Sequence, residues 1–146
     1  MKRLIWSGLV AVAVLGASVA GARADDKTAD RLNSRVHDVN DAAKKKGMMS
    51  EAMHTVSVET GVPREQVEGL HKRFPDVGPA GILIACVMAD ETKKAPEEFI
   101  KKHNSGDGWG TIAREHRVPQ DKLIERLDRL DRALTSGTDK RQRDRR

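Results

Sequence analysis

Four side chains with sulfur or nitrogen donor atoms lie close together between residues 48 and 54. They are Met48, Met49, Met53 and His54. Thioether and imidazole donors suit Cu(I). Residues four apart on a helix share a face, so Met49 and Met53 would both face one ion. Methionine is also an ordinary filler of hydrophobic cores. The cluster therefore has two interpretations, an exported copper-type metal site and plain core packing, and no other cofactor is expected.

Patterns typical of catalysis are absent from the sequence. It contains no G-x-S-x-G motif, no glycine-rich phosphate loop and no H-E-x-x-H pair. The single cysteine, Cys86, stands in the most apolar segment of the chain. Burial raises the pKa of a thiol and blocks access to it, so Cys86 is expected to be a buried hydrophobic residue and not a nucleophile. The sequence does not predict an enzyme.

One pattern occurs twice in the chain. Residues 56–67 can be aligned with residues 112–123. In both copies a short helical pattern ends, a Val-Pro pair follows, and an apolar residue stands four positions after the proline, Val67 in one copy and Leu123 in the other. A proline in the first turn of a helix is typical of a helix start, so both copies predict a helix, a turn and a second helix.

This repeated pattern resembles the helix-turn-helix motif. The first copy has the turn glycine, Gly61, whereas the second copy has Arg117 at that position. The resemblance covers residues 50–73 and 96–134 and implies two tri-helical units, with no characterised family identified beyond the motif. Because such units also serve as plain packing solutions, the motif alone does not assign a function.

Nucleic acid is an unlikely partner on charge grounds. The helix that would enter a DNA groove, residues 120–129, carries Asp121, Glu125 and Asp128. Phosphate groups repel these carboxylates. A membrane-tethered DNA-binding protein is the alternative if the N-terminal segment is not cleaved.

The last predicted helix carries a leucine seam with 4-3-4 spacing. It consists of Leu123, Leu127, Leu130 and Leu134. This spacing suits either a helix docked on its own core, which we favour, or a seam for self-association or a protein partner.

The N-terminus has the three parts of a secretory signal peptide. Lys2 and Arg3 give a positive start, residues 4–20 are almost wholly apolar, and Ala22 and Ala24 are the small residues that a signal peptidase reads. We expect cleavage after Ala24 and a periplasmic or secreted protein of a Gram-negative-type cell envelope. An uncleaved membrane anchor is the alternative.

Charge is unevenly distributed along the chain. Of 27 Lys and Arg, three stand in residues 1–24, which hold no acid, so 25–146 keeps 24 bases against 22 acids. Residues 138–146 hold five bases and two acids, which leaves residues 25–137 at net −1. This basic tail is expected to be disordered, and it either contacts an anionic membrane or polyanion or only keeps the protein soluble.

Apolar residues recur at spacings of three and four, which predicts helices and no strands. The apolar segment from Ile82 to Ala89 has no polar face and must be surrounded by other helices. We therefore expect an all-α bundle of two tri-helical units, 25–76 and 96–135, around a buried central helix at 77–95. The expected helices cover 28–46, 51–60 with Ser50 as its N-cap, 63–74, 79–94, 96–104, 109–116 and 119–134, and residues from 136 onward are a disordered tail. The expected function is that of a non-catalytic interaction or structural module.

Overall fold

The computed structural model describes residues 19–145, with the side chains of 24–137 and 142–145. This part of the chain contains seven α-helices and no strand, which confirms the all-α prediction. The helices are α1 (Val19–Lys45), α2 (Met49–Thr60), α3 (Arg64–Arg73), α4 (Gly78–Thr92), α5 (Pro96–Asn104), α6 (Trp109–Glu115) and α7 (Gln120–Arg143).

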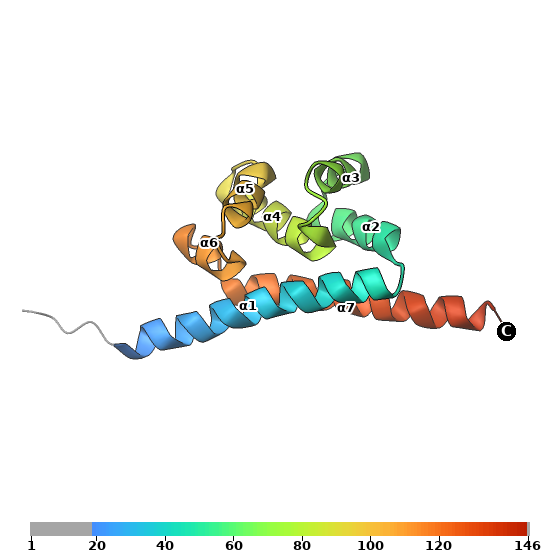
Figure 1. Cartoon of the computed structure of the whole chain (residues 1–146), viewed down its shortest axis with the longest axis horizontal. Helices are drawn as coiled ribbons and strands as arrows, with labels where there is room; N and C mark the ends of the chain where they lie inside the picture. The colour runs from blue at the N-terminus through green and yellow to red at the C-terminus, as the bar shows by residue number, and fades with distance from the viewer. Residues whose placement is uncertain (1–18, 146) are drawn as a thin grey trace, which may run out of the picture.

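The two longest helices form the base of the molecule. In Figure 1, α1 and α7 run side by side in the same direction, and the five shorter helices lie on one side of this pair. Arg35 of α1 donates hydrogen bonds to Asp128 and Asp131 of α7, at 2.8 and 2.9 Å. Each helix contributes an apolar stripe with 4-3-4 spacing, and all eight residues are buried: Leu32, Val36, Val39 and Ala43 from α1, and Leu123, Leu127, Leu130 and Leu134 from α7.

Helix α4 is the centre of the hydrophobic core. Its residues from Gly78 to Met88 are all buried. It packs against α1, α2, α3, α5 and α7. A helix without a polar face requires this surrounding, and the other helices are amphipathic because they have solvent on their outer sides.

The N-terminus of α4 is capped from another helix. No side chain of its own caps α4. Instead, Asn40 of α1 accepts a hydrogen bond from the Ala80 amide and donates one to the Val77 carbonyl, both at 2.9 Å. Two turns earlier on α1, Asn33 accepts a hydrogen bond from the Gly110 amide at 3.2 Å and so caps the start of α6. These two asparagines satisfy helix-end amides that would otherwise be left without partners.

Both Val-Pro turns contain a left-handed residue at the same position. Gly61 has φ of 71° and Arg117 has φ of 56°. The Arg117 backbone therefore adopts the conformation that the glycine of the first copy adopts easily.

Three boundaries differ from the sequence predictions. Ser50 is not the N-cap of α2, because Met48 is drawn into the core at 1% exposure and the helix begins at Met49. Helix α1 begins at Val19 and not at residue 28. Helix α7 continues to Arg143, where a disordered tail was expected from residue 136.

The continuation of α7 has a packing reason. Leu134 is fully buried. One turn later, a Cβ atom on Gly137 would lie 2.7 Å from Met48 Cε. It would also lie 2.8 Å from Glu51 Oε1, so α7 still packs against the start of α2 at Gly137, beyond its last buried leucine.

The N-terminal prediction falls mainly outside the described residues. Residues 1–18, which hold most of the expected signal peptide, lie beyond the described part of the chain. Ala22 and Ala24 lie in the first turns of α1, and the Ala24 side chain is exposed. Within residues 19–145, no helix has both the length and the apolar character that a membrane span requires.

Candidate functional site

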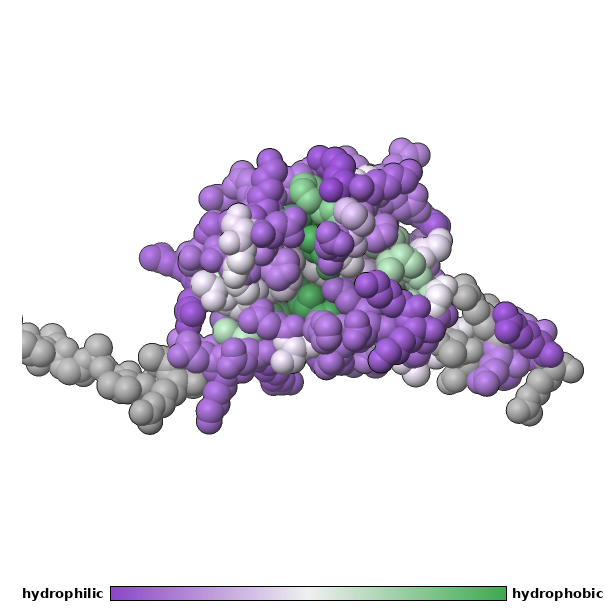
Figure 2. Space-filling model, in the orientation of Figure 1, coloured by the Kyte–Doolittle hydropathy of each residue, from purple (hydrophilic) through white to green (hydrophobic). Residues whose placement is uncertain are grey.

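A groove lies between α3 and α5, above α4. Its volume is about 600 Å³. Figure 2 shows hydrophobic surface at the bottom of a hollow between these helices, with hydrophilic side chains around it. The residues that line it come from the α2–α3 turn and from three helices: Thr60, Gly61, Val62, Pro63, Gln66, Gly69, Leu70, Arg73, Cys86, Ala89, Asp90, Pro96 and Glu97.

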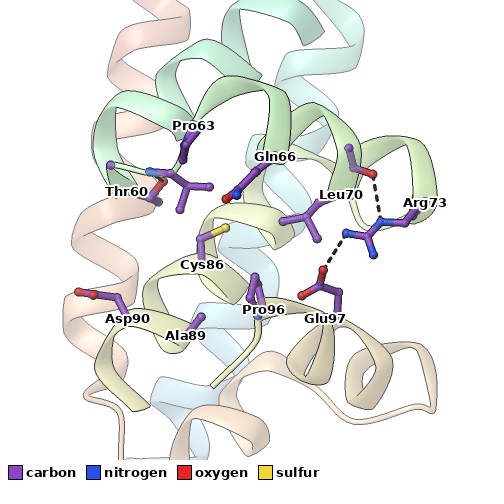
Figure 3. Close-up of a pocket in the computed structure, with 13 residues that line it drawn as sticks. Thr60, Pro63, Gln66, Leu70, Arg73, Cys86, Ala89, Asp90, Pro96 and Glu97 are labelled. Atoms are coloured by element: carbon purple, nitrogen blue, oxygen red, sulfur yellow. Dashed lines mark hydrogen bonds and ion pairs between the residues drawn. The ribbon is translucent and has the colours of Figure 1, made fainter. Parts of the chain in front are cut away.

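Cys86 lies at the floor of this groove (Figure 3). The residue is only 3% exposed. Burial, with a smaller contribution from the negative charge of Glu97, raises the pKa of its thiol to about 12. The thiol is protonated at neutral pH, and it contributes an apolar surface to the groove and not a nucleophile.

One end of the groove is closed by an ion pair between α3 and α5. Arg73 donates a hydrogen bond to Glu97 at 2.7 Å, and a second, longer one to the Gly69 carbonyl at 3.4 Å (Figure 3). Partial burial disfavours the Glu97 carboxylate, but hydrogen bonds from Arg73 and from its own backbone outweigh this effect. The pKa of Glu97 is therefore lowered, and the pair is charged at neutral pH.

A helical glycine forms part of the groove wall. Gly69 lies inside α3, and a Cβ atom placed on it would have no atom within 4 Å. Glycine inside a helix costs about 0.5–1 kcal/mol relative to alanine. At Gly78, by contrast, a Cβ would collide with Asn40. Packing within the described chain therefore explains Gly78 and does not explain Gly69.

The structure separates the four residues of the methionine and histidine cluster. Met48 is buried at 1% exposure and lies near Gly137 of α7, and Met53 is buried at 2%. Met49 is partly buried against the core. His54 is exposed to solvent. The four side chains therefore do not converge, although Met49 and Met53 remain together.

Met49 and Met53 line a second, smaller pocket between α2 and α3. Its volume is about 270 Å³, and its other lining residues are Ser50, Glu68, His71 and Lys72. Among the described residues, no group of three or more His, Cys, Asp and Glu side chains is placed to hold a metal ion.

The leucine seam of α7 is closed within the chain. Leu123, Leu127, Leu130 and Leu134 are each 0% exposed, and α7 packs against α1. This agrees with the interpretation that the helix docks on its own core. A second copy could reach these leucines only by displacing helices of the chain's own core. In the basic tail, the side chains of residues 142–145 are exposed, and those of residues 138–141 lie outside the described part.

The sequence does not show that a groove forms, and it does not place His71 beside Met49 and Met53. Arg73 and Glu97 are 24 residues apart and meet only in the folded chain. Gly69 was the one available signal, because a glycine inside a helical pattern without a turn invites a packing or functional reason.

No protein-family model, no curated protein and no solved structure matches this chain.

Proposed function

We propose that this protein is a non-catalytic, exported module of the cell envelope that binds a segment of a protein partner in the groove between α3 and α5. The observation that carries the proposal is the open space beside Gly69, a glycine in the interior of α3. The chain bears the energetic cost of a helical glycine at a point where its own packing leaves open space. A partner backbone that approaches α3 at this point uses the space.

The chemistry of the lining supports binding of a polypeptide segment. Leu70, Cys86 and Ala89 offer apolar surface at the floor. On the rim, Gln66 is exposed and carries both a donor and an acceptor, the same pair that a peptide backbone presents. An apolar floor with a few polar groups at its edge is the usual composition of a recognition site.

The same lining gives little support to catalysis. The described lining residues include no histidine, and the thiol of Cys86 is protonated at neutral pH because of its raised pKa. Nucleophilic catalysis requires an activated nucleophile next to a base. Binding is therefore the function that we propose.

Photo-cross-linking in cells tests this proposal. A photoreactive residue is introduced at Gln66, on the groove rim, and separately at Glu65, the neighbouring exposed residue of α3 that does not line the groove. We expect a discrete protein adduct from position 66 and none from position 65. Filling the groove with Gly69→Phe should abolish the adduct, provided that circular dichroism shows the variant to be folded.

Two results of this experiment would contradict the proposal. They are the absence of an adduct at position 66, and equal adducts at both positions that survive Gly69→Phe. An adduct with twice the mass of the chain would identify the partner as a second copy.

Export is tested separately by cell fractionation and intact mass. The proposal expects a periplasmic species that begins at Asp25. A full-length species in the inner membrane or cytoplasm would contradict export and would restore the DNA-binding alternative.

A further inference from the structure

The small pocket between α2 and α3 collects three metal-binding side chains from two helices. Met49 and Met53 stand one turn apart on α2, and His71 lines the same pocket from α3. Figure 2 shows a smaller area of hydrophobic surface over the α2 end of the body, apart from the hollow between α3 and α5. This pocket is separate from the proposed binding groove, because the two have no lining residue in common.

His71 has a buried ring nitrogen without a hydrogen-bond partner. Its Nδ1 atom is enclosed by protein, and no donor or acceptor of the described chain reaches it. A buried polar atom without a partner costs about 1–3 kcal/mol, so native proteins usually satisfy such atoms. A metal ion bound at Nδ1 satisfies this atom.

The charges around the pocket select against hard divalent ions. Its one carboxylate, Glu68, accepts a hydrogen bond from Arg64 at 2.7 Å, and this bond lowers the pKa of Glu68. Lys72 adds a positive charge to the rim. Calcium and magnesium need several free oxygen ligands, which this lining does not offer.

The remaining donors are two thioethers and one imidazole. Thioether sulfur is a soft ligand that selects monovalent copper over the hard and borderline divalent ions. We propose that Met49, Met53 and His71 form a binding site for a soft monovalent metal ion, Cu(I) or its chemical analogue Ag(I). Compared with the cluster predicted from the sequence, this site keeps Met49 and Met53, omits Met48 and His54, and adds His71 from the next helix.

Calorimetric titration of the purified protein with Ag(I) tests the site. We expect binding of about one ion per chain, and a loss of affinity of at least about tenfold in Met53→Leu and in His71→Phe. Met48→Leu and His54→Phe are the matched controls, because each removes the same type of donor from the same sequence region. Both controls should bind as the unchanged protein does.

Nitrogen-detected NMR of the unchanged protein provides a test that does not depend on the folding of a variant. Addition of Ag(I) should shift the Nδ1 signal of His71 and leave the ring signals of His54 in place. The proposal is overturned if Ag(I) does not bind, if His71→Phe binds with unchanged affinity, or if the His54 signals shift in place of those of His71. A repeat with Cu(I) under reducing conditions should give the same order of variants.

Discussion

The two Val-Pro turns of this protein have the same local structure and different surroundings. Gly61 and Arg117 both adopt positive φ, and a buried residue follows four positions after each proline. In the first copy the amide of Val67 bonds to the Pro63 carbonyl at 3.1 Å. In the second, the amide of Leu123 bonds to the equivalent carbonyl at 3.4 Å.

The helices that follow the two turns differ strongly. Helix α3 has 10 residues and buries only Val67 and Leu70. Helix α7 has 24 residues, its leucine seam is fully buried, and it packs against α1, α2 and α4. The comparison shows that the local pattern specifies the turn, whereas contacts with distant helices specify the length and exposure of the next helix. Helix α3 therefore leaves one side open along the groove that it forms with α5, whereas α7 is built into the core.

The largest expected effect comes from the paired buried residues after the two turns. Leu123→Ala should destabilise the protein by about 2–5 kcal/mol, because it leaves a cavity in the α1–α7 core. Val67→Ala removes fewer buried atoms and should cost about 2 kcal/mol. Urea denaturation of both variants measures the difference. A larger loss for Val67→Ala would show that α3, and not α7, carries the core.

The stability of the protein should respond in opposite directions to alanine substitution at Gly61 and at Gly69. Gly61→Ala forces a side chain into the left-handed conformation and should lose about 1 kcal/mol of unfolding free energy. Gly69→Ala should gain about 0.5–1 kcal/mol, because alanine is a better helix former and its Cβ meets open space. The midpoints of urea denaturation give both signs. Destabilisation by Gly69→Ala would remove the argument that Gly69 serves a partner.

Arg117 permits a test of whether the second turn is strained. Arg117→Gly should raise the unfolding free energy by up to about 1 kcal/mol, because glycine removes the steric cost of the left-handed conformation but adds entropy to the unfolded chain. Arg117→Ala is the control, because it removes the same charge and keeps the Cβ atom. An equal gain in both variants would assign the effect to the charge and not to the backbone.

The sequence predicted the elements that depend on local chemistry. Glycine and proline set the turn at Gly61 and the start of α5 at Pro96, and the apolar segment around Ile84 predicted the buried central helix. These features depend on backbone conformation and on the periodicity of apolar residues, and both can be derived from neighbouring residues.

The sequence could not predict the contacts between distant residues. The cap of α4 comes from Asn40, which accepts a hydrogen bond from the amide of Ala80, 40 residues later in the chain. The sequence does not bring His71 together with Met49 and Met53 for the same reason, because His71 forms no helical pair with either and shares a pocket with them only in the folded chain. The tertiary arrangement of α2 and α3 creates this pocket, and no local pattern encodes it.

The smallest expected effect concerns stability at acid pH. It comes from the ion pairs of α3 and α7, the helices that follow the two Val-Pro turns. Arg73 and Glu97 tie α3 to α5, and Lys122 and Glu91 tie α7 to α4. Because the folded pKa of Glu97 is lowered, its stabilising contribution is present above the ordinary pKa of 4.5 and is lost as the pH falls through the folded value.

The unfolding free energy of Glu97→Gln should therefore decrease less between neutral pH and about pH 3 than that of the unchanged protein. The difference should be less than about 1 kcal/mol, because the ion pair is partly exposed. Glu65→Gln removes the same charge from the exposed face of α3, and the Glu65 side chain forms no ion pair within the described part of the chain. Urea denaturation at a series of pH values compares the two variants. If Glu65→Gln flattens the profile as much as Glu97→Gln does, the acid sensitivity reflects net charge. If only Glu97→Gln does so, the Arg73–Glu97 pair holds α3 against α5, and the groove should open at low pH.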